Sequence, residues 1–344
     1  MRIVERLILV SGVFLFVGLV YHVGINVLVH DLSLVGAGFA AIFAQELFAF
    51  LFNTLGWYYT IRPAERRVTL GALFAMRLAG DGINYLTPSA SIGGAFAKVR
   101  LLQRRIPTPD AVSSVSLSVV NQFLAQVTFI LVSIPFLARQ LPVQADGSLA
   151  LGAFGLFVCA GMILLYLGRR REPLQRIHAL LVRRNWLRRW TANRDSWREL
   201  DERTFGAFRQ RPLGNALSAV FFTLGWGMGA LEIYLILYFL HAPVAWPVTI
   251  AIEGLSVLVD MFFFFVPSKI GTQEGGKYFI FLLLGLRPDT GFALGLVRRL
   301  REIAWSLVGL LAFSYLEFTN RGGSLSDLAI ISRPPTSGPN DRPR

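Results

Sequence analysis

The sequence predicts an all-α polytopic membrane protein with an inverted repeat, six full spans and two helical hairpins, counted as about eight transmembrane segments. Of the 344 residues, 54% are hydrophobic and 16% are charged, whereas soluble chains carry about 25% charged residues. Several apolar runs reach the ~20 residues that cross a bilayer core. Two further apolar runs stop at Pro, Ser and Gly clusters, and six residues recur at one constant offset. An ordinary soluble domain is therefore excluded.

The six full spans are apolar segments of 20 to 30 residues, at 7–29, 35–61, 109–138, 149–168, 213–241 and 290–318. The first is longer than the apolar core of a usual signal peptide, and no small-x-small cleavage site follows it. We therefore expect it to stay in the mature chain as a membrane span.

Two hairpins are predicted at 68–102 and 248–286, where an apolar helix breaks at 88–94 or 267–276 before a short second stretch. Proline removes a backbone donor and glycine lets the chain reverse, so both clusters break a helix. The end of the first hairpin carries four cations that hydrocarbon would exclude, Lys98, Arg100, Arg104 and Arg105. Each tip is expected to reach membrane depth, packed in protein or facing a wet cavity.

Arginine sets the predicted orientation. The cytoplasmic loop is assigned to 169–212, and its residues 169–211 hold thirteen Arg and five acids, +8 of the net charge of +13. Basic loops face the cytoplasm, so both termini are placed inside and the protein in the cell inner membrane. Trp and Leu at helical spacing in this loop favour a helix on the anionic inner leaflet, with RNA binding as the weaker alternative. The tail 321–344 is rich in Pro, Ser and Gly and is predicted to be disordered.

An internal repeat is indicated at an offset of 179 residues. The matching pairs are Asp81 and Asp260, Pro88 and Pro267, Ser89 and Ser268, Lys98 and Lys277, Pro109 and Pro288, and Asp110 and Asp289. The two units, about 40–140 and 219–318, each consist of a span, a hairpin and a span, and the predicted orientation makes them inverted. Chance alignment of generic membrane sequence is the alternative.

The two tips are the first candidate site. Half-helices that begin there direct unpaired N–H groups and positive dipole ends at mid-membrane, which suits an anion such as a lipid phosphate. The alternative is that the tip groups only satisfy the backbone of the broken helices. The candidate substrate-binding residues are Ser89, Ser91, Gly93, Gly94, Ser268, Gly271, Thr272, Glu274 and Gly275.

Ionisable residues inside the spans are the second candidate, because each costs about 3 kcal/mol or more at the bilayer centre without a partner. Arg77 and Asp81, and likewise Arg298 and Glu302, are four residues apart, so each pair can neutralise itself. Arg298 and Arg301 can alternatively bind a phosphate bidentately, and the sequence favours neither role. The ion-coupling or structural charges are Arg77, Asp81, Glu253, Asp260 and Glu302.

Enzyme signatures are scarce. The sequence has no Walker A motif, no HExxH and no GxSxG, and its four His are dispersed. The single Cys159 excludes an intramolecular disulfide and a thiolate metal site. We expect no catalytic residue, metal, cofactor or nucleic-acid partner. Any transport is expected to be passive or coupled to an ion, with four candidate proton carriers, Asp81, Glu253, Asp260 and Glu274.

The tip Leu86-Thr-Pro88-Ser-Ala-Ser-Ile-Gly93-Gly94 with Lys98-Val-Arg100, and the tip Pro267-Ser-Lys-Ile-Gly271-Thr-Gln-Glu274-Gly275, resemble the lysylphosphatidylglycerol synthase transmembrane, or flippase-like, family. The likeness covers about 35–318 and implies a flippase-like transmembrane domain at 1–320. In bifunctional members a soluble aminoacyl-transferase domain makes the lipid and the membrane region moves it to the outer leaflet. Only a short tail follows Phe318 here, so the resemblance implies translocation without synthesis. Stand-alone members are associated with hopanoid biosynthesis and archaeal glycosylation.

Three functional hypotheses follow. The leading one is a lipid flippase or transporter that binds the polar headgroup of an aminoacyl-phospholipid, a hopanoid or an isoprenoid-linked lipid at the midplane. The alternative is a membrane-embedded lipid-modifying transferase, with Glu253, Asp260 or Glu274 as a base and Arg298 and Arg301 on a phosphate. The third is a non-catalytic scaffold that docks lipid-biosynthesis proteins through the loop 169–212.

Overall fold

The computed structural model describes residues 21, 25–66, 68–86, 92–140, 211–263, 266, 269 and 271–331, and every regular element among them is a helix. The all-α prediction is therefore confirmed for this part of the chain. The predicted span 149–168, most of the span 7–29 and nearly all of the loop 169–212 lie outside it.

The helices in chain order are α2 (Ile25–Val35), α3 (Gly38–Thr60), the short 3-10 helix η1 (Pro63–Glu65), α4 (Leu70–Leu86), α5 (Ile92–Leu102), α6 (Thr108–Ala138), α10 (Pro212–Phe239), α11 (Trp246–Phe262), α12 (Thr272–Leu283) and α13 (Pro288–Ile331). Among the described residues, α3, α6 and α10 are long and apolar enough to cross a membrane. They coincide with the predicted spans 35–61, 109–138 and 213–241 to within three residues at each end. Proline in the first turn favours the starts of α6 and α10, because it lacks an N–H that would have no partner there.

The two predicted hairpins are formed by α4 with α5 and by α11 with α12. The first helix of each has 17 residues, and the second has 11 in α5 and 12 in α12. At 1.5 Å per residue the second helices are roughly 17 Å long, about half of a hydrocarbon core. The predicted order of long helix, break and short helix is therefore found, although residues 87–91 and 267–268 lie outside the described part.

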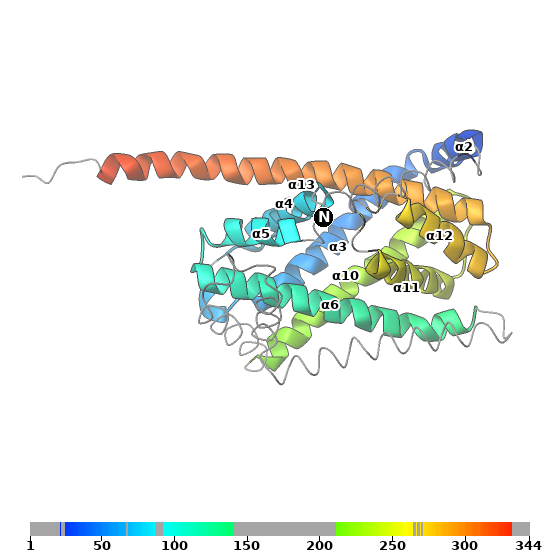
Figure 1. The fold of residues 1–344 in the computed structure, drawn as a ribbon, viewed down its shortest axis with the longest axis horizontal. Helices are drawn as coiled ribbons and strands as arrows, with labels where there is room; N and C mark the ends of the chain where they lie inside the picture. Colours follow the sequence, from blue (N-terminus) through cyan, green and yellow to red (C-terminus); the bar gives the residue numbers. More distant parts are fainter. Residues whose placement is uncertain are drawn as a thin grey trace, which may run out of the picture.

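The helix arrangement follows the predicted repeat. Shifted by 179 residues, α5 and α6 begin within one residue of α12 and α13. Figure 1 shows α3 and α10 crossing through the middle, with the α4–α5 hairpin at one end and the α11–α12 hairpin at the other. Helix α13 packs along α4, and its counterpart α6 packs along α11. Each hairpin is thus held by the last helix of the opposite unit.

Small residues lie at both of these helix contacts, between α4 and α13 and between α11 and α6. A Cβ on Gly82 of α4 would lie 3.0 Å from Gly309 Cα of α13, so the two backbones touch. On the other side, a Cβ on Gly254 of α11 would overlap the Ser133 side chain of α6. Small residues let helices approach closely in a membrane, where van der Waals packing replaces the hydrophobic effect as a driving force.

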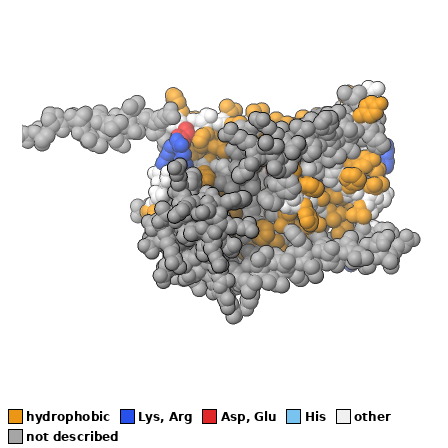
Figure 2. Space-filling model, in the orientation of Figure 1, with side chains coloured by type: hydrophobic (Ala, Val, Ile, Leu, Met, Phe, Trp, Pro, Cys, Tyr) orange, Lys and Arg blue, Asp and Glu red, His pale blue; other side chains and the backbone are white. Residues whose placement is uncertain are grey.

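The apolar core of the described part consists of three clusters. One surrounds Trp57, Leu73 and Phe222 near the first hairpin, one surrounds Ile233 and Phe281 near the second, and a smaller one joins α6, α10 and α11. Outside the core, hydrophobic side chains cover much of the described surface, while the charged side chains visible on this face lie towards its ends (Figure 2). Such an exposed apolar surface fits a lipid environment.

The C-terminal prediction differs from the structure. Helix α13 continues to Ile331, eleven residues into the segment 321–344 that was predicted to be disordered. Gly322 and Gly323 weaken a helix without ending it, and the first helix-breaking residue is Pro334. The rest of the tail lies outside the described residues.

Candidate functional site

In the first hairpin, the glycines after the tip bring two helices together. The Gly94 N–H donates to Asn84 Oδ1 at 2.6 Å, and a Cβ on Gly94 would overlap the Gly80 carbonyl oxygen. Gly94 therefore lets α5 lie directly against α4. Gly93 is half-buried and lines neither of the two cavities described below. The predicted residues Ser89 and Ser91 lie outside the described part.

In the second hairpin, residues of the tip form hydrogen bonds with the backbone groups of the tip itself. Gly271 is the N-cap of α12 at a φ of 77°, and its N–H donates to Glu274 Oε2 at 3.0 Å. The Gly275 N–H donates to the Gly271 carbonyl at 2.9 Å, and Thr272 Oγ1 donates to the Lys269 carbonyl at 3.1 Å.

Glu274 is fully buried, and its other oxygen pairs with Arg299. Of the two interpretations the sequence left open, these contacts match the structural one, and none of the four tip residues in α12 and its cap lines either cavity. Ser268 lies outside the described residues.

Arg298 of α13 is held by two helices of the second unit. Its guanidinium pairs with Glu232 of α10 at 2.8 Å and with Glu253 of α11 at 2.9 Å, and it donates to the Gly229 carbonyl at 3.2 Å. The predicted pair of Arg298 with Glu302 is not formed, since Arg298 turns towards α10 and α11. Glu302 instead accepts a hydrogen bond from Gln273 Nε2 at 2.9 Å.

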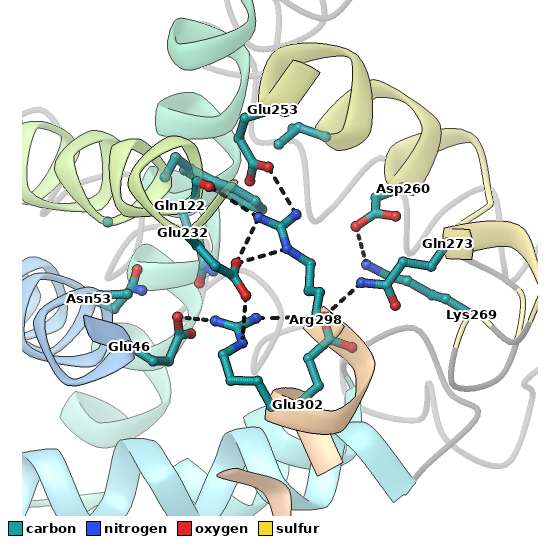
Figure 3. Close-up of a pocket in the computed structure, with 16 residues that line it drawn as sticks. Glu46, Asn53, Gln122, Glu232, Glu253, Asp260, Lys269, Gln273, Arg298 and Glu302 are labelled. Atoms are coloured by element: carbon teal, nitrogen blue, oxygen red, sulfur yellow. Dashed lines mark hydrogen bonds and ion pairs between the residues drawn. The ribbon is translucent and has the colours of Figure 1, made fainter. Parts of the chain in front are cut away.

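Arg301 is also surrounded by carboxylates. It pairs with Glu46 of α3 and with Glu232 at 2.9 Å, and Glu302 lies 3.8 Å away. Four carboxylates therefore surround Arg298 and Arg301, as Figure 3 shows for most of these contacts. Charge-assisted pairs of this kind occupy a guanidinium fork, so both arginines act as ion-pair partners in this arrangement.

The hairpins carry separate charged groups. Asp81 accepts from Arg77 at 2.7 Å, as the four-residue spacing predicted, and also from Lys98 of α5 at 2.7 Å. Asp260 pairs with Lys269 at 2.7 Å. Glu253 and Asp260 share a face of α11 but turn to different cations.

A polar cavity of about 230 Å³ lies where α3, α10, α11 and α13 meet (Figure 3). Its charged lining consists of Glu46, Glu232, Glu253, Asp260, Lys269, Arg298, Arg301 and Glu302. The predicted charges Arg298, Arg301, Glu253, Asp260 and Glu302 are thus brought together, although they lie on α11 and α13. We call this space the smaller cavity.

A larger cavity of about 590 Å³ lies between the first hairpin and α6. Its charged lining consists of Arg77, Asp81, Lys98, Asp260 and Lys269, and much of the rest is apolar. Four residues line both cavities, namely Gln122, Trp226, Asp260 and Lys269. The two cavities therefore adjoin, with the Asp260–Lys269 ion pair in their common wall.

The two cavities differ in formal charge. In the smaller one five carboxylates face three cations, an excess of two negative charges. In the larger one three cations face two carboxylates, an excess of one positive charge. A surplus of one charge in a low-dielectric site attracts a ligand of the opposite sign, so the larger cavity suits a monoanion. Within the described part of the chain, no group of three or more His, Cys, Asp and Glu side chains is arranged to hold a metal ion.

The predicted site residues did not include several that line the cavities. Lys98 was recognised only as a hairpin cation, and Glu46, Glu232, Lys269 and Gln122 were not proposed as ligands. The sequence could have indicated the lysines as site residues, because the chain has only three, at 98, 269 and 277. No local pattern in α3 or α10 indicates that Glu46 and Glu232 meet one arginine.

Comparison with known proteins gives one match. A family model described as the lysylphosphatidylglycerol synthase TM region matches residues 3–309. The match includes both hairpins and every residue that lines the two cavities. Neither a curated protein nor a solved structure matches the chain.

Proposed function

Since this chain belongs to the lysylphosphatidylglycerol synthase transmembrane family, we propose that it is a lipid flippase, which moves a phosphate-bearing lipid between the leaflets of the inner membrane. The headgroup passes through the two adjoining cavities while the tails stay in the bilayer. The Arg-rich loop 169–212 rests on the anionic cytoplasmic surface, and both termini are cytoplasmic.

Two open polar cavities inside an apolar bundle carry this proposal. Eleven charged side chains line them, and each would cost about 3 kcal/mol or more at mid-membrane without a partner. Ion pairs that served packing alone would be closed over by neighbouring side chains. Here about 230 Å³ and about 590 Å³ stay open beside them, at the interface between the two repeat units.

The larger cavity is the one suited to an amphiphile. Its surplus positive charge suits a phosphodiester, and its apolar lining suits the glycerol or prenyl portion next to it. Val119 and Phe123 of α6 line this cavity and are also 53% and 37% exposed. Their exposure supports a lateral opening through which the tails stay in hydrocarbon.

Leaflet exchange of labelled lipids in liposomes tests the proposal. The lipids are phosphatidylglycerol, its aminoacylated form and a hopanoid or polyprenyl glycolipid, each with the full-length chain. We expect the wild type to accelerate exchange of one class and Lys98→Met to abolish most of it. The matched control is Arg287→Met, which removes an exposed cation before α13 and leaves both cavities intact.

The same liposomes separate the other hypotheses. Under the flippase proposal the mass of the lipid does not change during exchange. If no lipid moves but its mass changes when candidate donors are supplied, the protein is a lipid-modifying transferase. If neither occurs, and deletion of 171–209 releases lipid-biosynthesis proteins, the scaffold hypothesis replaces the flippase.

A further inference from the structure

The chain uses lysine only at its hairpins. It contains 31 arginines and three lysines, with Lys98 in α5, Lys269 between α11 and α12, and Lys277 in α12. An arginine guanidinium holds a carboxylate in a planar fork, whereas a lysine ammonium is a point charge on a flexible stem. A lysine is therefore the better cation where an ion pair has to break and form again.

The two hairpins use their lysines differently. In the first, Lys98 and Arg77 both bind Asp81. In the second, the repeat counterpart of Asp81 is Asp260, which pairs with Lys269, and the counterpart of Lys98 is Lys277. Lys277 is only 2% exposed, and no hydrogen bond or ion pair joins its side chain to a described residue. The charged groups that act on it electrostatically are Arg298, Asp260, Glu302 and Glu253.

The second hairpin has a larger side chain at the position that Lys98 crosses in the first hairpin. In the first hairpin Lys98 passes over Gly80 to reach Asp81, and a Cβ on Gly80 would overlap the Lys98 side chain. The counterpart of Gly80 is Val259, which packs so closely on α12 that a Cβ on Gly276 would lie 2.8 Å from its Cγ1. The route that Lys98 takes over Gly80 is therefore filled by Val259 in the second hairpin, and a shift of α12 along α11 would open it for Lys277.

Lys269 is the cation best placed for a ligand. It lines both cavities, 40% of its side chain is exposed, and Asp260 is its one ion-pair partner among the described residues. The other charges that act on it are Glu302 and Arg298. Arg298 and Arg301 are already surrounded by four carboxylates, as described above. An anion entering from the larger cavity therefore competes with Asp260 for Lys269.

We infer that Lys269 binds the anionic headgroup, and that Asp260 passes from Lys269 to Lys277 as it does so. A phosphodiester oxygen replaces the Asp260 carboxylate at the Lys269 ammonium, and Lys277 supplies the displaced carboxylate with a new cation. Without Lys277 the half-buried carboxylate would be left without a cation, which is unfavourable at membrane depth. The inference rests on the proposed function and adds to it a ligand residue, Lys269, and a positioning residue, Lys277.

Lipid binding to the purified full-length protein in detergent tests the exchange. The probes are fluorescent phosphatidylglycerol, fluorescent diacylglycerol as its uncharged analogue, and glycerol 3-phosphate as a competitor. We expect Lys269→Met and Lys277→Met each to weaken phosphatidylglycerol binding by about tenfold or more, and diacylglycerol binding to change little. Val259→Ala, which changes no charge, is expected to tighten phosphatidylglycerol binding because it opens the path from Lys277 to Asp260.

A pair of double variants separates ion-pair exchange from a general loss of positive charge. Lys277→Met with Asp260→Asn removes the carboxylate that competes for Lys269, so binding is expected to return at least to the wild-type level. Lys277→Met with Glu302→Gln restores the same net charge but leaves Asp260 on Lys269, so it is expected to stay weak. Arg287→Met serves as the control and should bind like the wild type.

Several outcomes would overturn the inference. The inference is contradicted if either Lys277→Met or Lys269→Met binds phosphatidylglycerol as tightly as the wild type. It is also contradicted if Glu302→Gln restores binding to Lys277→Met as well as Asp260→Asn does. Competition by glycerol 3-phosphate as strong as by the lipid would identify a free organophosphate as the ligand. If the wild type moves phosphatidylglycerol but Lys269→Met and Lys277→Met bind it as the wild type does, the flippase stands and this inference fails. If the wild type moves no lipid, the proposed function itself fails.

Discussion

Arg298 is the residue whose loss should harm stability most. Among the described residues, it is the one cation that pairs with Glu253, whose side chain is 5% exposed. Replacing Arg298 with Met leaves this carboxylate buried without a partner, which typically costs 3–5 kcal/mol, so we expect a loss of roughly 3 kcal/mol in the free energy of unfolding. Equilibrium unfolding in mixed micelles measures this loss. Arg298→Met with Glu253→Gln should recover part of it, and a loss below ~1 kcal/mol in the single variant would contradict the assignment.

Single residues could be predicted only in part from the sequence. The pair of Arg77 with Asp81 followed from a spacing of four residues, because such residues lie on one face of a helix. The same rule was wrong for Arg298 and Glu302, since a longer-range partner outcompetes a neighbour. Glu232 lies 66 residues from Arg298, and Glu46 lies 255 residues from Arg301. Partners at such separations depend on helix packing, which no local pattern specifies.

The contact between α4 and α13 depends on a small residue on each helix. A Cβ on Gly309 would overlap the Leu78 carbonyl oxygen, so Gly309→Ala forces the helices apart. Overpacking of this kind costs about 1–3 kcal/mol, and we expect lower stability and slower lipid exchange. The matched control is Gly227→Ala in α10, where a Cβ would meet nothing within 4 Å. There the substitution should be neutral or stabilising by up to about 1 kcal/mol. Thermal unfolding of both variants checks this, and equal behaviour would refute the role of Gly309.

The positions of the helices were predicted more accurately than the contacts of single residues. Apolar length placed α3, α6 and α10 to within three residues, because lipid-facing helices need long uninterrupted apolar runs. The hairpins followed from Pro and Gly clusters, since these residues break a helix wherever they occur. Helix α13 continues to Ile331, past the predicted start of the tail at residue 321, because that start was assigned from the Pro, Ser and Gly content of the whole segment. Glycine lowers helix stability without forbidding the helix.

At the scale of the whole molecule, the repeat could be predicted from the sequence and the cavities could not. Matching residues at an offset of 179 anticipated the order of helices in both units. The cavities arise where side chains of both units meet, at Gln122 and Trp226 among others. Two candidate sites were predicted, the hairpin tips, because helix ends attract anions, and the membrane charges. In the second hairpin the start of α12 is satisfied by Glu274 and by backbone groups, and the open volume is lined by the predicted charges together with Lys269 and Gln273 of the tip.

The apolar surface of the molecule should make it sensitive to charge at mid-membrane. Phe48 lies near the middle of α3 and is 56% exposed, so in a bilayer it faces lipid. An arginine at the centre of a membrane helix costs about 2.5–3.5 kcal/mol on insertion scales. We therefore expect Phe48→Arg to reduce the membrane-integrated yield about tenfold or more. Leu70 is similarly exposed, at 44%, but begins α4 directly after the basic segment 62–67, which the same charge rule places at the cytoplasmic surface, so Leu70→Arg should insert normally. Comparing carbonate-resistant membrane fractions measures both variants, and equal yields would mean that the exposed face of α3 does not contact lipid.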